Sequence, residues 1–511
     1  MKFNPPKEDV NEDDFYKSTA MAAYLEKYVD EHIYSGTTLR DRIRFACTVN
    51  KVDQTTTGWT IHYARSDKPE SITTRKLIVA SGSTSVPNMP SLPGRDTFGG
   101  PIVHTVEYGR SKIFARQDIK SVAVIGGGKS AADMVYANVK AGREVKWIIR
   151  ASGKGPGVFV DVQLKAGYIH NAGELGVVRA AASLLTLPGL QAMSWWQWFL
   201  YDTRVGSWVL GKYMGALTSM LTASARYDDR PGARETFKLL KTDVDAASLQ
   251  TPAGGKHHAD FWDVVARNVD VYRKDIERLA PGKIVFTDGT WTDADAILCG
   301  TGFKDTIPFF TEEQRIQLGL PHAVDAEPPE MQKEWEDLNA TAEEAVRKRF
   351  YTLRDPPPQP QTNKWGDVDP STTPFRLYNC IIPTSPSFNH SIAFVGFATL
   401  TNMYASSELG AIYATAYLDG HLTSKLPSEQ DMKRDVAYVT SYMRMRTPTY
   451  GRAGNWYVMD FHQCVDRWMG DVGLVSYRGK GWWRDRFHPL FMEDFGGLRD
   501  EYVGRYGRGE R

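Results

Sequence analysis

One glycine-rich segment constrains the fold of this chain more than any other feature. An apolar run typical of a buried strand (SVAVI) begins at Ser121, leads directly into GGGKSA, and is followed by a helical pattern (AADMVYANVKAG). In G-x-G-x-x-A spacing the first glycine permits a tight turn, the second lets a pyrophosphate approach, and the small third residue lets helix and strand pack closely. The segment therefore predicts a dinucleotide-binding turn with phosphates at the helix N-terminus. The residues expected to bind there are Gly126, Gly128, Lys129, Ser130 and Ala131.

The next strand pattern ends in a cation. Residues 143–150 (REVKWIIR) follow the helical pattern and place Arg150 at their end. A carboxylate at this point would accept the ribose 2′-hydroxyl of NAD, whereas an arginine suits the 2′-phosphate of NADP. The sequence therefore predicts NADPH as the dinucleotide, with Arg150 as a binding residue.

Composition and cysteine spacing exclude several other classes. The 511 residues are 42% hydrophobic and 24% charged, enough for two or three domains, and the net charge of +1 gives no reason to expect a nucleic-acid partner. The four cysteines are far apart and form no C-x-x-C, which argues against a zinc site, against a dithiol redox centre, and for a reducing, cytoplasmic location. No metal site is expected. The cysteines are Cys47, Cys299, Cys380 and Cys464.

One stretch raises the question of a membrane. Residues 180–201 (AAASLLTLPGLQAMSWWQWFLY) carry no charge over a length that could cross a bilayer. Pro188 and Gly189 interrupt this stretch, and charges follow from Asp202 onward. We therefore expect a buried or substrate-covering helical insert. The main alternative is an interfacial helix that makes a peripheral membrane contact through residues 180–225, and a true span fits least.

Strand and helix patterns alternate along the chain, which predicts the α/β class. Two strand segments each end in a small-residue turn, one on either side of the glycine-rich unit: one reaches Ser81-Gly82 and the other reaches Gly300-Thr301-Gly302. This is the organisation of one nucleotide-binding Rossmann-like domain inserted in another. The expected elements are a helix at 16–32, strands at 43–52, 58–64, 71–80, 283–286 and 293–298, a turn at Asp288-Gly289, an extended loop at 355–361, and a strand, turn and helix within 391–420.

Four segments follow from this pattern. We expect a first nucleotide-binding part at 1–109, an NADP-binding domain at 110–300 with a helical insert at about 151–270, a return to the first nucleotide-binding domain at 301–420, and a C-terminal extension at 421–511. Periodicity in the extension is poor, so it either caps the core or forms a partner surface.

Three further motifs resemble the flavin-containing monooxygenases. Residues 98–108 (FGGPIVHTVEY) look like the family signature F-x-G-x-x-x-H-x-x-x-[YF], carried here by Phe98, Gly100, His104 and Tyr108. Residues 295–303 (DAILCGTGF) and 394–397 (FVGF), the latter with Glu408 in the following helix, resemble two later family segments. The Baeyer–Villiger branch usually carries Trp where Tyr108 stands, which favours the flavin-containing monooxygenase side. The pattern GGGKSAAD is similar to secondary-metabolite monooxygenases of filamentous fungi.

The resemblance implies the chemistry. In this family NADPH reduces FAD, O2 adds to the reduced flavin as a hydroperoxide, and one oxygen atom passes to a small, lipophilic substrate. The cofactors carry the reaction, so no catalytic residue is assigned, and His104 is expected to fix a linker more than to move a proton. The residues implied at the flavin are Val49, whose strand would meet the adenine, with Ser81, Gly82, Thr301 and Gly302.

The resemblance also implies an N-terminally incomplete FAD domain. Family members begin with a strand, G-x-G-x-x-G and an acidic residue that bind FAD, and no such motif precedes Tyr16. We expect a truncated N-terminus and weak FAD binding by the sequence as written. The alternatives are a truncated or inactive NADP-binding relic and a Baeyer–Villiger-type monooxygenase, while the absence of C-x-x-C argues against a disulfide reductase.

Overall fold

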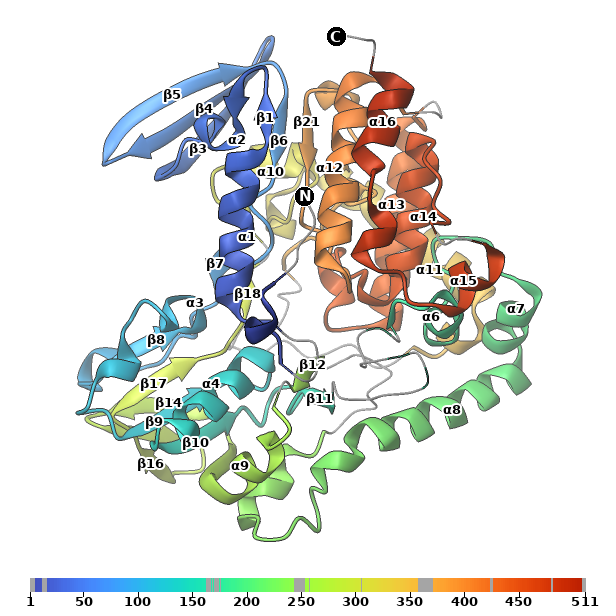
Figure 1. Ribbon diagram of the computed structural model, residues 1–511. Helices are drawn as coiled ribbons and strands as arrows, with labels where there is room; N and C mark the ends of the chain where they lie inside the picture. Colours follow the sequence, from blue (N-terminus) through green and yellow to red (C-terminus); the bar gives the residue numbers. More distant parts are fainter. Residues whose placement is uncertain are drawn as a thin grey trace.

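The computed structural model divides into an α/β half and a second half rich in helices (Figure 1). The structure describes residues 5–11, 16–161, 167, 169, 174, 176–242, 253–256, 258–304, 306–356, 371–422, 426–478 and 481–507. Most of the loop expected at 355–361 lies outside these residues. The α/β class predicted from the strand and helix patterns is confirmed.

A five-stranded parallel sheet forms the core of the α/β half. Its strand order is β13-β10-β9-β17-β8, and every neighbouring pair is parallel. Successive residues of β9 point to opposite faces: Val122 and Val124 pack under the helices, whereas Ala123 packs under a small antiparallel sheet. Both faces are therefore covered, which explains why β9 is apolar throughout. The strands are β8 (Ile102–His104), β9 (Ser121–Ile125), β10 (Glu144–Ile149), β13 (Val269–Arg273) and β17 (Ala296–Cys299).

Two helices cover one face of this sheet and an antiparallel meander covers the other. The edge strand β8 (residues 102–104) precedes residue 110, where we expected the NADP-binding domain to begin. It nevertheless belongs to the same sheet as the strands of that domain. The expected turn at Asp288-Gly289 joins β15 to β16. The covering elements are α4 (Lys129–Lys140), α9 (Phe261–Asn268), β14 (Ile276–Ala280), β15 (Lys283–Phe286) and β16 (Trp291–Asp293).

The other half also combines parallel strands with an antiparallel sheet. The antiparallel sheet β3-β4-β5 precedes β6, and β6 pairs in parallel with β21. The single strand expected at 71–80 is wrong: it divides at Arg75-Lys76, because β5 stays with β4 while Leu77 donates its N–H to Ser391 O (2.8 Å) and starts a different sheet. The strand expected from residue 43 begins only at Cys47, after a short helix. The elements are α1 (Ser18–Glu31), β1 (Ile33–Tyr34), β2 (Thr37–Thr38), α2 (Leu39–Arg42), β3 (Cys47–Thr55), β4 (Gly58–Arg65), β5 (Lys68–Thr74), β6 (Leu77–Val79) and β21 (Ile392–Phe394).

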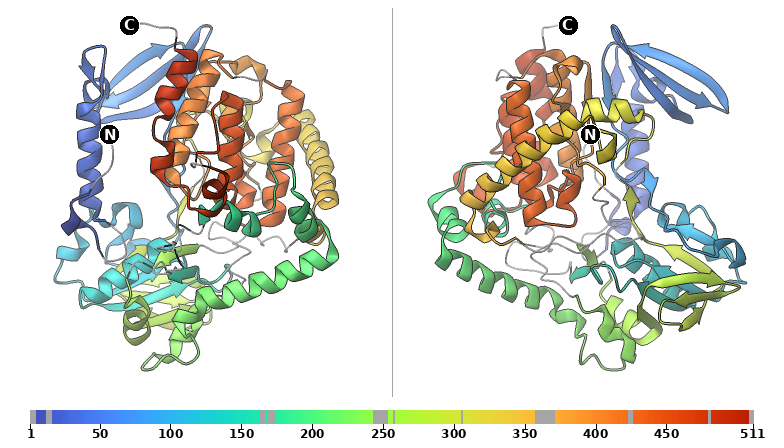
Figure 2. Two further views of the ribbon diagram at one scale, coloured as in Figure 1. Left: turned by 45° about the vertical axis from the view of Figure 1, so that its right-hand side comes forward. Right: turned by 180° about the vertical axis from the view of Figure 1, so that it is seen from behind.

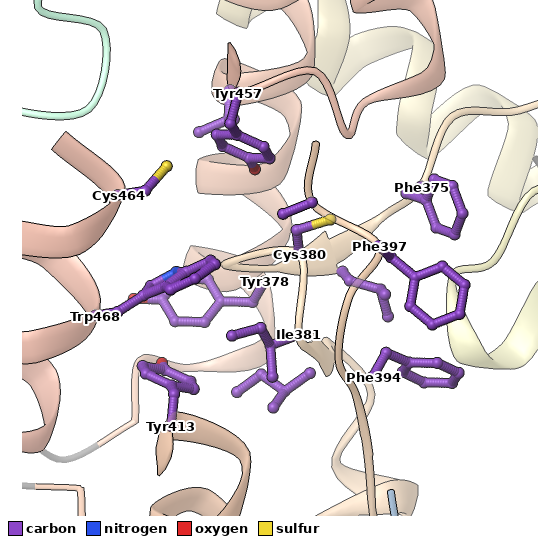
Figure 3. Close-up of a cluster of buried hydrophobic side chains, with 14 of the residues drawn as sticks. Phe375, Tyr378, Cys380, Ile381, Phe394, Phe397, Tyr413, Tyr457, Cys464 and Trp468 are labelled. Carbon is purple, nitrogen blue, oxygen red and sulfur yellow. The ribbon is translucent and has the colours of Figure 1, made fainter. Parts of the chain in front are cut away.

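The C-terminal segment caps the core of this second half. Side chains of α12, α13 and α14 share one buried cluster with β21, and Figure 3 shows its centre, where Cys380, Tyr457, Cys464 and Trp468 lie among phenylalanines. This packing supports the cap for residues 426–478, and the partner surface stays a prediction. The elements are α10 (Glu312–Leu318), α11 (Pro329–Arg349), β19 (Leu377–Tyr378), β20 (Ile382–Pro383), α12 (Met403–Asp419), α13 (Glu429–Arg446), α14 (Phe461–Val472), α15 (Trp482–Phe487) and α16 (Leu498–Tyr506).

The insert is helical, as expected, but its first part packs on the C-terminal helices. Leu187 O accepts hydrogen bonds from Tyr442 Oη and Gln463 Nε2 (3.0 Å each), and Arg179 forms an ion pair with Asp466 (2.6 Å). Helix α8 then runs back toward the parallel sheet (Figure 1). No helix among the described residues is long and apolar enough to cross a membrane. The elements are β11 (Val158–Asp161), α6 (Arg179–Leu185), α7 (Trp195–Asp202), α8 (Arg204–Thr222) and β12 (Ala253–Lys256).

A two-stranded linker joins the halves. Strand β7 (Val86–Pro87) leads into the α/β half and pairs antiparallel with β18 (Phe303–Lys304), which leads out of it. The α/β half is thus inserted between β6 and the segment that returns to β21, as the repeated strand pattern predicts.

Candidate dinucleotide site

The glycine turn between β9 and α4 is built by close backbone contacts. Gly126 has a φ of 130°, and a Cβ there would lie 2.3 Å from Gly300 O. A Cβ on Gly300 would in turn lie 2.8 Å from the Cα of Ala131. Small residues at these three positions therefore let the start of α4 approach the ends of β9 and β17.

The N-terminus of α4 offers backbone N–H groups at this turn. Gly128 is the N-cap residue and has no side chain with which to cap the helix. Ser130 lies in the first turn and is exposed. The unsatisfied N–H groups and the positive end of the helix dipole suit a pyrophosphate. The predicted strand, turn and helix are therefore present, and the binding role of Gly126, Gly128, Ser130 and Ala131 stays a prediction.

The side chain of Lys129 is already engaged. Its Nζ forms an ion pair with Asp133, one helical turn along α4. Its stem lies against β12, since a Cβ on Gly254 would be 2.9 Å from Lys129 Cβ. The charge of Lys129 is therefore paired within α4, and its role in cofactor binding stays a prediction.

A segment that the sequence reasoning missed forms a wall beside the turn. Gly157 donates its N–H to Gly127 O (2.7 Å), and a Cβ on Gly127 would lie 2.7 Å from Gly155 O. The run GKGPG at residues 153–157 is the signal that could have indicated this close approach.

Arg150 stands where the sequence predicts, directly after β10. Its side chain is partly exposed and lies over Gly153, where a Cβ would be 2.5 Å from Arg150 Nε. Two residues further on, Ser152 Oγ donates to Asp275 Oδ1 (2.6 Å). Asp275 follows β13, the strand that pairs with β10 in the sheet. A cation at the end of the second strand suits a 2′-phosphate.

The motif residues from Phe98 to His104 fasten β8 to β17. Phe98 is buried under the parallel sheet, and Gly100 passes so close to β17 that a Cβ would lie 2.1 Å from Asp295 O. The Asp295 carboxylate accepts the N–H groups of Lys120 and Ser121 (2.8 and 2.9 Å) at the start of β9. These residues build the sheet that carries the glycine turn.

His104 and Tyr108 also hold neighbouring parts of the α/β half together. His104 Nε2 donates to Gly302 O (2.9 Å), its Nδ1 accepts from the Val106 N–H (3.3 Å), and burial lowers the pKa of the imidazole. Tyr108 Oη accepts from Asn138 Nδ2 of α4 (2.7 Å), and burial raises the pKa of Tyr108 to about 12. Nε2 of His104 thus contacts the backbone next to β18, and Nδ1 holds the backbone two residues further along the chain. The structural role expected for His104 stays a prediction.

The residues implied at a flavin lie in three places. Thr301 Oγ1 donates to Asn88 O (2.7 Å), and Gly302, with φ 77°, follows it at the linker. The turn Ser81-Gly82 follows β6 and lies beside the end of β21, since a Cβ on Gly82 would be 3.9 Å from Gly396 O. Val49 lies on β3, in the antiparallel sheet at the opposite end of the molecule from α4 (Figure 1). The roles of Val49, Ser81, Gly82, Thr301 and Gly302 at a flavin stay predictions.

The chain is similar to several known oxidoreductases. The family described as pyridine nucleotide-disulphide oxidoreductase matches residues 5–166. An FAD-dependent monooxygenase, resA, of Aspergillus sclerotiorum is 29% identical over 506 residues, which cover 95% of this chain and 84% of that protein. An FAD-dependent monooxygenase of Pyrenophora dematioidea is 29% identical, with 91% and 85% covered. A Baeyer-Villiger monooxygenase of Streptomyces coelicolor is 26% identical, with 56% and 50% covered.

Solved structures show the same fold. Cyclohexanone monooxygenase with bound epsilon-caprolactone, in its Loose conformation, has a TM-score of 0.55 at 16% identity, covering 90% of this chain and 84% of that one. Its open form has a TM-score of 0.52 at 15% identity, with the same shares covered. The solved structures therefore show the fold of this chain. Along most of its length the chain is similar to FAD-dependent monooxygenases of fungi.

Proposed function

We propose that this protein is an NADPH- and FAD-dependent monooxygenase that transfers one oxygen atom from O2 to a small, lipophilic substrate. The observation that carries the proposal is the turn at Gly126. It leads into a helix whose N-cap residue is a glycine, and Arg150 follows the next strand. The similarity to FAD-dependent monooxygenases of fungi along most of the chain supports the oxygenase class.

The residues present fit a nicotinamide dinucleotide. The N–H groups at the start of α4 would hold the pyrophosphate, and the guanidinium of Arg150 would pair with the 2′-phosphate. The buried contacts of His104 and Gly302 would hold the linker in place beside the bound cofactor.

For FAD, the described residues offer the turns after β6 and β21. Ser81, Gly82 and Gly396 lie at the carboxyl ends of these parallel strands, the edge at which α/β sheets bind nucleotides. When bound, FAD accepts a hydride from NADPH and activates O2. The residues of this chain are then required to position the nicotinamide and to exclude water.

The test combines anaerobic flavin reduction with oxygen-isotope incorporation. The 511-residue chain, supplied with excess FAD, is mixed anaerobically with NADPH, and loss of the visible flavin absorbance is followed. The reaction is then run under ¹⁸O2 with a panel of lipophilic substrates. We expect flavin bleaching and one ¹⁸O atom in the product. Bleaching that ends only in hydrogen peroxide for every substrate would contradict monooxygenation.

A Baeyer–Villiger reaction is the second candidate. The similarity to a Baeyer-Villiger monooxygenase supports it. Tyr108 stands where that branch usually carries Trp, which favours the flavin-containing monooxygenase side over ketone-to-ester conversion. A ketone panel separates the two, because only a Baeyer–Villiger enzyme converts ketones to esters or lactones.

A further inference from the structure

Helices α7 and α8 carry large apolar side chains on their solvent side. Trp195 is 81% exposed, Trp208 65% and Trp198 52%. We define the α7–α8 apolar face as Trp195, Trp198, Val205, Trp208, Val209 and Met220, all of which are more than two-fifths exposed. Single exposed apolar residues are normal, but a run of them on two consecutive helices is typical of an interaction surface.

Helical spacing puts the α8 members of this face on one side. Val205, Trp208 and Val209 are separated by three and four residues, whereas Gly206 and Leu210 on the other side are buried. A Cβ on Gly206 would lie 1.8 Å from Phe199 O, so the inner side of α8 packs tightly on α7. Packing within the chain thus uses one apolar side of α8, and a second apolar side faces solvent.

The exposed charges around this face are positive. Between Trp195 and Thr222 the chain has three charged residues: Asp202, Arg204 and Lys212. Asp202 is largely buried and pairs with Arg354 (3.8 Å), whereas Arg204 and Lys212 are exposed. Lys212 Nζ lies 6.0 Å from the centre of the Trp208 ring. Exposed tryptophans beside cations suit the headgroup region of an anionic bilayer.

The placement of α8 fits a flat surface. The helix has 19 residues, about 28 Å at 1.5 Å per residue, and runs along the outer margin of the molecule between the two halves (Figures 1 and 2). Helix α15, which packs beside α6, adds Trp482 and Trp483, each 63% exposed, and Arg486 lies 5.0 Å from the Trp482 ring centre.

We propose that the α7–α8 apolar face docks this protein on the surface of a bilayer that contains anionic lipids, with α8 lying in the interface plane. The tryptophans would enter the boundary between headgroups and acyl chains, and Arg204 and Lys212 would pair with lipid phosphates. This inference goes beyond the proposed monooxygenase and does not depend on its activity. Docking there would bring the protein to the phase in which lipophilic compounds collect.

The test is co-sedimentation of the 511-residue chain with vesicles of phosphatidylcholine alone or with about one-third phosphatidylserine. We expect binding to the anionic vesicles, and a loss of about tenfold or more in the variant Trp195→Gln/Trp198→Gln/Trp208→Gln, because three interfacial anchors are removed. The matched control is Ile33→Gln/Phe45→Gln/Trp291→Gln, whose side chains are 64%, 53% and 55% exposed elsewhere. Arg204→Gln/Lys212→Gln is expected to weaken the preference for anionic vesicles.

Three results would overturn the proposal. The first is a wild-type chain that stays in the supernatant with both kinds of vesicle. The second is an equal loss of binding in the control variant. The third is a wild-type dimer that becomes a monomer in the tryptophan variant without any vesicle binding, which would make the face a contact between copies. Thermal unfolding followed by circular dichroism checks that both variants fold, and flavin reduction is measured separately.

Discussion

At the residue scale, the family motif acts mainly on the chain itself. Phe98 and Gly100 hold β8 against β17, His104 holds the linker through Gly302 O, and Tyr108 accepts a hydrogen bond from α4. The motif precedes the glycine turn in the sequence, and through these contacts it supports the strands and the helix on either side of that turn.

Arg150 is the residue on which cofactor preference depends. We predict that Arg150→Ala raises the KM for NADPH more than tenfold and leaves the KM for NADH nearly unchanged, because a charge-assisted contact to the 2′-phosphate is worth about 1.5 to 3 kcal/mol. Steady-state flavin reduction with each nucleotide measures the effect, and Arg150→Lys serves as the charge-preserving control. Equal loss with both nucleotides would refute the assignment.

His462 gives the folded chain a pH dependence. It lies on α14 and is 7% exposed, and burial, with Arg179 nearby, lowers the pKa of His462 to about 3. The unfolded chain binds a proton near the ordinary pKa of about 6.5, so the stabilisation from a neutral His462 is present above that pH and is lost as the pH falls toward 3.

We therefore predict that the free energy of unfolding falls between pH 7 and pH 5, and that His462→Phe reduces this fall. Urea unfolding at several pH values measures it, with exposed His258→Phe as the control. A variant with the same slope as wild type would show that His462 does not contribute.

At the element scale, the sequence predicts what depends on neighbours along the chain. The strand and turn from Ser121 to Ala131 and the strand before Arg150 appear as expected, because apolar runs and glycine spacing determine them locally. The packing of the insert was not predictable in this way, since Arg179 and Asp466 are 287 residues apart. The same holds for the break at Arg75-Lys76, which is caused by pairing of β6 with β21.

The contact between α4 and β17 depends on Gly300. We predict that Gly300→Ala lowers both thermal stability and NADPH affinity, because the added Cβ would lie 2.8 Å from Ala131 Cα and would push α4 away from the sheet. A loss of about 1 to 3 kcal/mol is typical of such overpacking. Gly109→Ala is the matched control, since its Cβ would meet nothing within 4 Å and its φ is −66°. Equal melting temperatures for wild type and Gly300→Ala would contradict the prediction.

At the scale of the whole molecule, the two halves differ in how their strands are paired. Strand β17 has β9 on one edge and β8 on the other, whereas β6 pairs with β21 and no further strand among the described residues pairs with it. Ile78, at the centre of β6, is 41% exposed. Among the described residues, the sheet of β6 and β21 therefore has two strands, and the free edge of β6 can pair with another chain.

We predict that residues 1–511, expressed as they stand, retain less than one FAD per chain after gel filtration and tend to associate through this edge. The flavin content after denaturation, compared with protein concentration, measures occupancy, and light scattering measures association. Charged Ile78→Lys should reduce association without restoring FAD. A monomer that purifies with a full complement of FAD would show the prediction to be wrong.

The pairing of β6 with β21 has a consequence for synthesis on the ribosome. Trp59, next to this sheet, donates a hydrogen bond to Ser391 O, 332 residues later. At about 5 to 20 residues per second, the N-terminal strands wait roughly 20 to 60 seconds for their partner to be translated. During that time Leu77, Ile78 and Val79 are exposed in the nascent chain. Chaperones that hold extended apolar segments should therefore determine how much of this protein reaches its folded state in the cell.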